Sequence, residues 1–429
     1  MRRAIALSGG GTKGAYEVGV WKALMELGID YEIVTGTSIG ALNGALMAVR
    51  EYERACEIWD TIEMQDIMAD GLNLTTIEGM YNQREAIRPF LKRSMKNKGA
   101  DVSPFEEFIS RLVDEERVRN SDVDYGLVTV QFSTLKALEL TKEEIPHGML
   151  KDYIMASSSV FPVFPMHKIN GELYLDGCYY DNLPIDLALK MGADEVIAVD
   201  LHNSPQHPNY VNKPYVKYII PSRPLGTILN FERSILDANR MLGYYDTLKA
   251  FGRLDGCEYM FYQEDLDQYR DEICSFVSRV ARTESYLTEG TFNKFVKPGD
   301  SRRLCGNIED HIQKEYYTRQ DYFIGAAEIC GEIFGLSQEE PWYLAEYVEN
   351  LISQMIPEEQ VELESFDSTS SMELATRLAE LKLKRDSRYI VSCIYYAFRR
   401  GKIDLMEQLG LLTFVPYELA AALFLVTMI

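Results

Sequence analysis

A serine between two glycines is the clearest candidate for chemistry in this sequence. Residues 36–40 (GTSIG) match the pattern G-x-S-x-G, with Gly36 and Gly40 on either side of Ser38. In that pattern the serine lies on a sharp strand-to-helix turn, where small flanking residues leave its hydroxyl exposed. Alternatively, Ser38 caps an ordinary helix and the glycines only permit a tight turn. The apolar segments on both sides favour a nucleophilic serine.

A glycine-rich loop precedes this serine by one strand and one helix. It consists of Gly9, Gly10, Gly11, Thr12, Lys13 and Gly14. Glycines let backbone N–H groups converge on an anion, and the N-terminus of the following helix adds partial positive charge. The loop is therefore predicted to hold an anion.

Two anions fit this loop. Gly9-x-Gly11-x-x-Gly14 matches the dinucleotide pattern G-x-G-x-x-G, but that pattern also needs an acidic residue at the end of the second strand. Residues 34–36 (VTG) occupy that place. The other anion is the oxyanion that forms when a serine attacks an acyl group, which needs a nucleophile at a neighbouring strand end.

A serine nucleophile needs a base to take its proton. The five histidines lie in no recognisable motif; they are His147, His167, His202, His207 and His311. A carboxylate can replace histidine where a dry site raises its pKa. Asp176 follows a short apolar run and precedes Gly177 and Cys178, so it is the candidate base, although it could equally belong to an Asp-Gly turn.

Alternating strands and helices must position these residues. Residues 4–7, 31–34, 125–132, 195–201 and 216–220 are predicted strands, and apolar helices are predicted after residue 14 and over 41–49. This order indicates an α/β fold with a parallel sheet covered by helices. We expect residues 1–225 to form this domain and residues 226–429 to form a mainly helical region.

Composition excludes several classes of protein. The 429 residues carry a formal net charge of −22, which makes general nucleic-acid binding improbable. The seven cysteines lack metal-site spacing and are interpreted as reduced thiols. We find no signal peptide and no uninterrupted membrane-spanning segment, so a cytoplasmic protein is expected. The apolar segment 414–429 is interpreted as a buried helix.

The three motifs together resemble the patatin-like phospholipase family. That family has a glycine-rich loop, a G-x-S-x-G turn and a D-G-[GA] motif in this order. Here the third motif is Asp176-Gly177-Cys178, in which a small cysteine replaces the usual glycine or alanine. The resemblance covers about residues 4–221, and residues 231–245 resemble the helix that often follows the domain in bacterial members.

The resemblance implies a Ser-Asp dyad, with Ser38 as nucleophile and Asp176 as base. It also implies an oxyanion hole made by backbone amides around Gly10, Gly11 and Thr12, with Lys13 flanking it. Neither a metal nor a cofactor is required, because the carboxylate and the amides fill the base and electrophile roles. The implied substrate is a lipid ester: a phospholipid, a lysophospholipid or a neutral glycerolipid.

Other features leave alternatives open. A basic cluster between residues 84 and 98 could face a lipid headgroup or interface, or be a solvated helix face; it contains Arg84, Arg88, Lys92, Arg93, Lys96 and Lys98. The acidic segment 320–376 could bind a partner or be a solvated surface. Alternative functions are a nucleotide-binding protein that uses the glycine loop, and a catalytically silent scaffold.

Overall fold

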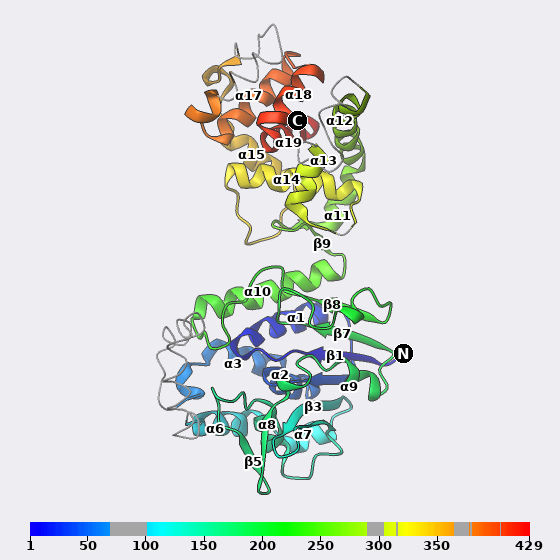
Figure 1. The fold of residues 1–429 in the computed structure, drawn as a ribbon, viewed down its shortest axis with the longest axis vertical. Coiled ribbons are helices and arrows are strands. Elements are labelled where there is room, and N and C mark those ends of the chain that lie inside the picture. The colour runs from blue at the N-terminus through cyan, green and yellow to red at the C-terminus, as the bar shows by residue number, and fades with distance from the viewer. Residues whose placement is uncertain (69–100, 290–303, 315, 364–376, 378–379, 404) are drawn as a thin grey trace. The chain divides into compact units, whose positions relative to one another are not determined.

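The chain forms two compact units. The computed structural model describes residues 1–68, 101–289, 304–314, 316–363, 377, 380–403 and 405–429. The first unit spans Met1–Phe251 and the second spans Gly252–Ile429 (Figure 1). Within these described residues, no helix combines the length and the apolar character needed to cross a membrane.

The first unit is an α/β domain in which strands and helices alternate (Figure 1). Its strands are β1 (Arg3–Leu7), β2 (Ile33–Gly36), β3 (Asp124–Gln131), β4 (Lys136–Thr141), β5 (His167–Ile169), β6 (Glu172–Asp176), β7 (Glu195–Val199) and β8 (Val216–Ile219). Its α-helices are α1 (Ala15–Glu26), α2 (Ile39–Ala48), α3 (Tyr52–Thr61), α6 (Ser103–Leu112), α7 (Glu115–Asn120), α8 (Leu150–Ser157), α9 (Ile185–Lys190) and α10 (Arg233–Ala250). Short 3₁₀ turns are η1 (Gly11–Gly14), η2 (Met64–Asp66), η3 (Gly177–Tyr179) and η4 (Pro208–Tyr210).

The strands form one sheet in the order β5-β6-β3-β2-β1-β7-β8, with β4 also paired to β3. All pairings among β3, β2, β1, β7 and β8 are parallel, which confirms the predicted parallel core. The pairings β3–β4, β3–β6 and β5–β6 are antiparallel. The sheet is therefore mixed at one end. The sequence does not predict β4 and β5, because β4 is half-exposed and β5 has only three residues.

Both faces of the sheet are buried, as a parallel sheet requires. Ile5 and Leu7 point into the larger core with residues of α1, α2, α3 and α6. Ala4 and Ala6, which alternate with them, point into a smaller core with residues of α9. The helices and the sheet thus form three layers, with β1 and β2 at the centre.

The first unit extends beyond the expected boundary at residue 225. α10 packs along α1, and the two helices approach closely where a Cβ on Gly19 would lie 1.8 Å from the Arg240 carbonyl oxygen. A Cβ on Gly243 would lie 2.0 Å from the Tyr16 carbonyl oxygen. This glycine-mediated contact keeps α10 with the sheet, so the division falls after Phe251. The helix predicted around residues 231–245 is present.

The second unit is mainly helical, as predicted for this region. Its α-helices are α11 (Gln263–Leu266), α12 (Arg270–Glu289), α13 (Leu304–Ile312), α14 (Arg319–Phe334), α15 (Leu344–Gln354), α17 (Ser387–Arg399), α18 (Leu405–Phe414) and α19 (Pro416–Met428). The 3₁₀ turns η5 (Asp267–Tyr269) and η7 (Glu358–Gln360) and a short hairpin of β9 (Leu254–Asp255) and β10 (Phe261–Tyr262) complete it.

The core of the second unit is built around α14 and α19. Phe323 on α14 packs against Phe276 on α12 and Phe424 on α19, with ring centroids 5.8 and 5.2 Å apart. Residues 419–425 of α19 are all buried. The apolar C-terminal segment is therefore a core helix, as predicted.

Candidate active site

Ser38 lies on a strained turn between β2 and α2. Its backbone has φ 56° and ψ −123°, a conformation that residues other than glycine rarely adopt and that costs about 1–3 kcal/mol. A Cβ on Gly36 would lie 2.1 Å from the Gly40 carbonyl oxygen, and one on Gly40 would lie 2.6 Å from the Leu7 carbonyl oxygen. The turn therefore needs both glycines, as the pattern predicted.

A second serine holds this turn in place. The Ser38 backbone N–H donates to Ser157 Oγ at 3.0 Å, and the Ser157 hydroxyl donates to the Val128 carbonyl oxygen at 2.7 Å. Ser157 thereby links the turn to β3. The sequence offered only a weak signal for this residue, a run of three serines before Asp176.

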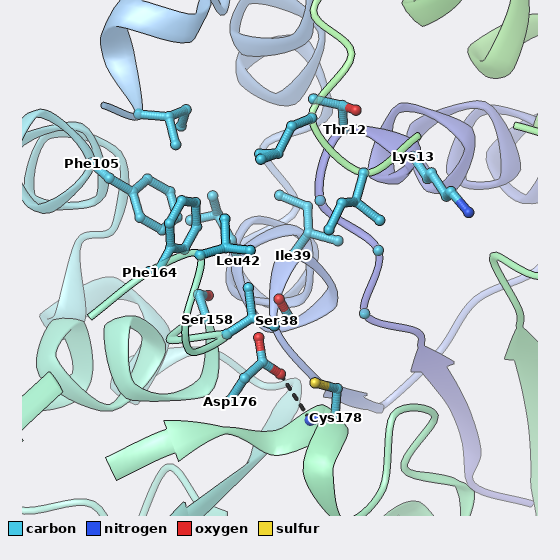
Figure 2. Close-up of a pocket in the computed structure, with 18 of the residues that line it drawn as sticks. Thr12, Lys13, Ser38, Ile39, Leu42, Phe105, Ser158, Phe164, Asp176 and Cys178 are labelled. Atoms are coloured by element: carbon cyan, nitrogen blue, oxygen red, sulfur yellow. Dashed lines mark hydrogen bonds between the residues drawn. The ribbon is translucent and has the colours of Figure 1, made fainter. Parts of the chain in front are cut away.

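Asp176 ends β6 and points toward Ser38 (Figure 2). Its side chain is buried, and Oδ1 accepts a hydrogen bond of 2.8 Å from the Cys178 backbone N–H. Burial raises the pKa of Asp176 to about 6, although the Cys178 backbone N–H and the Ser38 side chain favour the ionised form. Asp176 is thus a carboxylate of raised basicity that is still ionised near neutral pH.

Gly177 and Cys178 shape the turn after Asp176. A Cβ on Gly177 would lie 2.3 Å from the Val128 carbonyl oxygen, so only glycine fits there. Cys178 lines the same cavity as Ser38 (Figure 2). Burial and the nearby Asp176 raise the pKa of its thiol, which keeps the thiol protonated. The cysteine therefore takes the place of a smaller residue without adding a thiolate.

The glycine loop lies against the Ser38 turn. A Cβ on Gly9 would lie 3.1 Å from Ser38 Cβ, and one on Gly14 would lie 2.6 Å from Ile39 Cγ1. The Gly9 amide donates to the Asn182 carbonyl oxygen at 2.9 Å, which fixes the start of the loop.

The loop amides differ in what they donate to. The Thr12 amide donates to the Ile228 carbonyl oxygen at 2.9 Å, so it is engaged within the protein. The amides of Gly10 and Gly11 have no acceptor among the described residues. Gly11 has φ 59°, and its Cβ position is filled by the Ile228 carbonyl oxygen. Gly10 and Gly11, rather than Thr12, are therefore the loop donors available to an oxyanion.

Lys13 lines the cavity but its side chain is directed away from Ser38 (Figure 2). Burial lowers its pKa, and attraction to Asp200 opposes that change. Asp200 is itself buried and accepts hydrogen bonds from Gln206 and Tyr218. The Lys13 ammonium group is thus attracted to Asp200 and does not point toward Ser38.

A polar network that the sequence did not reveal supports the loop from below. Asn182 Nδ2 donates to the Gly9 carbonyl oxygen at 3.0 Å and to Gln206 Oε1 at 2.9 Å. Gln206 Nε2 donates to Asp200 Oδ1 at 2.6 Å and to Ser8 Oγ at 2.9 Å. These contacts come from residues after β7 and before α9, far from the loop in sequence, so no local pattern predicts them.

Three histidines of the first unit lie beside acidic residues other than Asp176. His202 lines the cavity, but its Nδ1 lies 3.3 Å from Asp200 Oδ1. His207 Nε2 lies 2.9 Å from Asp181, and His167 Nε2 lies 3.0 Å from Asp152. Within the described part of the chain, no hydrogen bond joins a histidine to Ser38, and Asp176 is the ionisable group beside it.

Ser38 and Asp176 open into an apolar cavity of about 360 Å³. Aromatic and aliphatic side chains of α2, α3, α6 and the following loops form most of its wall; they include Leu42, Trp59, Phe105, Phe108, Val163 and Phe164. Figure 2 shows Phe105 and Phe164 on the side of the cavity away from the glycine loop. The cavity can hold a hydrocarbon chain beside the serine. The basic cluster between residues 84 and 98 lies outside the described residues.

The sequence of this chain is similar to those of known proteins over part of its length. Residues 5–189 match the sequence model of the family described as "Patatin-like phospholipase". The chain is 28% identical over 332 residues to patatin-like phospholipase domain-containing protein 7 of Mus musculus, covering 71% of this chain and 22% of that protein. It is 30% identical over 211 residues to lysophospholipase nte1 of Aspergillus niger, covering 47% of this chain and 12% of that protein.

The chain therefore spans about a fifth or less of these relatives. Among solved structures, VipD from Legionella pneumophila aligns with a TM-score of 0.39 and 13% identity, covering 83% of this chain and 88% of that one.

Proposed function

We propose that this protein, whose residues 5–189 match the patatin-like phospholipase family, is a lipid acyl hydrolase with a Ser38–Asp176 dyad. The observation that carries the proposal is the meeting of three features in one cavity. A serine on a strained turn, a buried carboxylate and an apolar wall are what acyl-ester hydrolysis through a serine requires.

The first half of the reaction forms an acyl-serine. Asp176 accepts the Ser38 hydroxyl proton while Ser38 Oγ attacks the ester carbonyl carbon. When the tetrahedral intermediate collapses, the bond to the alcohol oxygen breaks and that oxygen takes the proton from Asp176. In the second half, water attacks the acyl-serine and gives a proton to Asp176. That proton returns to Ser38 Oγ as the fatty acid leaves.

Backbone amides stabilise the oxyanion in both halves. The available donors are the Gly10 and Gly11 amides in the loop and the Ile39 amide, which follows the nucleophile at the start of α2. Each preorganised donor is worth about 3–4 kcal/mol in the transition state. The N-terminus of α2 adds favourable partial charge.

The substrate we propose is an acyl ester with a hydrocarbon chain, such as a phospholipid, a lysophospholipid or a neutral glycerolipid. The apolar cavity and the relatives named for phospholipase and lysophospholipase activity support this class. Such a substrate requires at least transient contact with a membrane or micelle. Neither a metal nor a cofactor has a role in these steps.

The test is fatty-acid release from a panel of phospholipids, lysophospholipids and acylglycerols, with EDTA present. Wild type is compared with Ser38→Ala, Asp176→Asn and, as a matched control, Ser133→Ala, which changes an exposed serine of the same unit. We expect release from wild type and Ser133→Ala only. A folded wild type that releases nothing would overturn the proposal, and a shift of its melting temperature by NAD or ATP would favour the nucleotide-binding alternative.

A further inference from the structure

A second buried carboxyl lies behind the candidate active site, and the steps above do not use it. Glu17, in the first turn of α1, is 1% exposed. Its Oε2 accepts a hydrogen bond of 2.7 Å from Asn43 Nδ2. Its Oε1 is buried and has no hydrogen-bond partner.

Asn43 connects Glu17 to both halves of the site. Besides Glu17, Asn43 Nδ2 donates to the carbonyl oxygen of Gly14, the last glycine of the loop, at 3.1 Å. Asn43 lies on α2, the helix that begins next to Ser38, and its Oδ1 accepts from Trp59 Nε1 at 3.1 Å. The Glu17–Asn43 pair therefore ties the helix that follows the glycine loop to the helix that carries the nucleophile.

No cation balances a charge on Glu17 from the elements nearest to it in the site. α2 has no ionisable residue in its sequence. In η1, Lys13 interacts with Asp200. The backbone N–H of Ser8, after β1, is the other group that favours the ionised form.

Charged residues on α3 and α10, which also pack on α1, interact with residues other than Glu17. On α3, Arg54 pairs with Glu51, and Asp60 pairs with Arg240 of α10. Asp246 is a buried acidic residue of α10, and it accepts a hydrogen bond of 3.0 Å from the Tyr16 hydroxyl.

A carboxylate buried without a cation is strongly disfavoured, so Glu17 is held as the neutral acid. We propose that Glu17 is a protonated positioning residue, which holds the glycine loop against the nucleophile helix, and that its ionisation at alkaline pH slows acyl transfer. This inference rests on the proposed function of the site. An ionised Glu17 would place a negative charge behind the loop that receives the oxyanion, and would oppose its formation.

The expected pH dependence follows from the environment of the carboxyl. Burial raises the pKa of Glu17 to about 8, although Asn43 and the Ser8 backbone N–H oppose this change. Wild-type kcat should therefore fall above pH 8, by about tenfold at one pH unit above the pKa if the ionised form is inactive. KM should change little, because the effect acts on the transition state.

The experiment compares the pH profiles of kcat and KM from pH 6 to 10 for wild type, Glu17→Gln and Glu26→Gln. Glu26 is an exposed carboxyl on the same helix and serves as the matched control. We expect the alkaline fall in wild type and Glu26→Gln, and no alkaline fall in Glu17→Gln; the rise with Asp176 ionisation near pH 6 should remain in all three. An unchanged alkaline fall in Glu17→Gln would overturn the inference and leave the proposed function intact.

Two further readouts keep the test decisive. In Asn43→Ala, loss of the donor that favours the ionised form should move the alkaline fall to higher pH; a fall at the same pH or lower would contradict the inference. In urea unfolding, wild type should lose stability relative to Glu17→Gln as pH rises from about 5 to 8, because the folded state keeps a proton that the unfolded state releases. A pH-independent difference would also overturn it. No hydrolysis by wild type at any pH would overturn the proposed function, and the positioning role of Glu17 with it.

Discussion

The two units each bury a carboxylate, but they surround it differently. Asp176 in the first unit accepts one backbone N–H and opens into a cavity beside Ser38. Glu328 in the second unit is fully buried, and its Oε1 accepts from the backbone N–H groups of Cys257 and Tyr259 at 2.6 and 3.1 Å. Its Oε2 lies 3.3 Å from His311 Nε2.

This difference separates the carboxylate that we propose as a base from one that only stabilises the fold. Burial raises the pKa of Asp176, so ionisation of this carboxyl group costs more free energy in the folded state than in the unfolded state. Glu328 instead accepts two backbone N–H groups on one oxygen and has the His311 imidazole beside the other, and its proximity raises the pKa of His311. Removing the charge should therefore stabilise the first unit and destabilise the second.

The largest effect is expected at the nucleophile. Ser38→Ala should lower kcat by about 10⁴-fold, because the acyl-serine can no longer form. The melting temperature should stay at or above that of wild type, since the substitution removes no hydrogen bond that holds the turn. Steady-state kinetics and thermal unfolding test this together. Activity within tenfold of wild type would assign the nucleophile elsewhere.

Glu328→Leu should cause the largest loss of stability. It removes the acceptor of two buried N–H groups and leaves His311 without its carboxylate, which we expect to destabilise the second unit by about 3–5 kcal/mol. Urea unfolding measures this, with the exposed Glu346→Gln on α15 as control. The kcat per folded molecule should not change, because every described residue that lines the cavity lies in the first unit. A loss below 1 kcal/mol would remove the contrast between the two carboxylates.

Asp176→Asn should instead raise the free energy of unfolding. Because burial raises the pKa of Asp176 to about 6, the wild type loses stability as pH rises from about 4 to 6. At pH 8 the asparagine variant should be more stable by about 2–3 kcal/mol, and at pH 4 the difference should vanish. Urea unfolding at the two pH values measures this difference in stability. A variant less stable than wild type at pH 8 would contradict the account.

Ser157→Ala tests the support of the turn. It leaves the Ser38 amide and the Val128 carbonyl oxygen without their shared partner. We expect kcat to fall about tenfold with KM nearly unchanged, because the nucleophile is displaced rather than removed. A matched control is Ser159→Ala, since the Ser159 hydroxyl donates to the Met155 carbonyl oxygen of the preceding helix α8 and not to the Ser38 turn. Equal kcat for the two variants would argue against a positioning role.

The smallest effect is expected at Cys178. Its thiol is protonated and lies near Asp176, but the 2.8 Å hydrogen bond to Asp176 comes from the Cys178 backbone N–H, which the substitution keeps. Cys178→Ala should therefore keep kcat within about threefold of wild type, as a small change in a cavity wall. A loss above tenfold would show that the thiol itself takes part.

Local patterns predicted the residues that the structure brings together in the proposed site. The backbone around Ser38 and in the glycine loop requires glycine, and a glycine pattern is visible in a few consecutive residues. The apolar strands of the parallel core are also visible in short segments of the sequence. The Asp176 motif alone was ambiguous in the sequence, because an Asp-Gly pair also forms ordinary turns.

The residues that support the site could not be predicted in the same way. Ser157, Asn182 and Gln206 act through contacts with residues more than twenty positions away. The same holds for Thr12, whose amide donates to the carbonyl oxygen of Ile228, a residue in the loop before α10. Such contacts depend on the tertiary fold, which no local pattern specifies.

The most direct test of the central claim is to locate the product of an active-site label. Wild type and Asp176→Asn are treated with a fluorophosphonate, and the modified peptide is identified by mass spectrometry. The account predicts a single adduct on Ser38, formed about 100-fold more slowly in Asp176→Asn. A folded wild type that stays unlabelled, or an adduct on another residue, would contradict it.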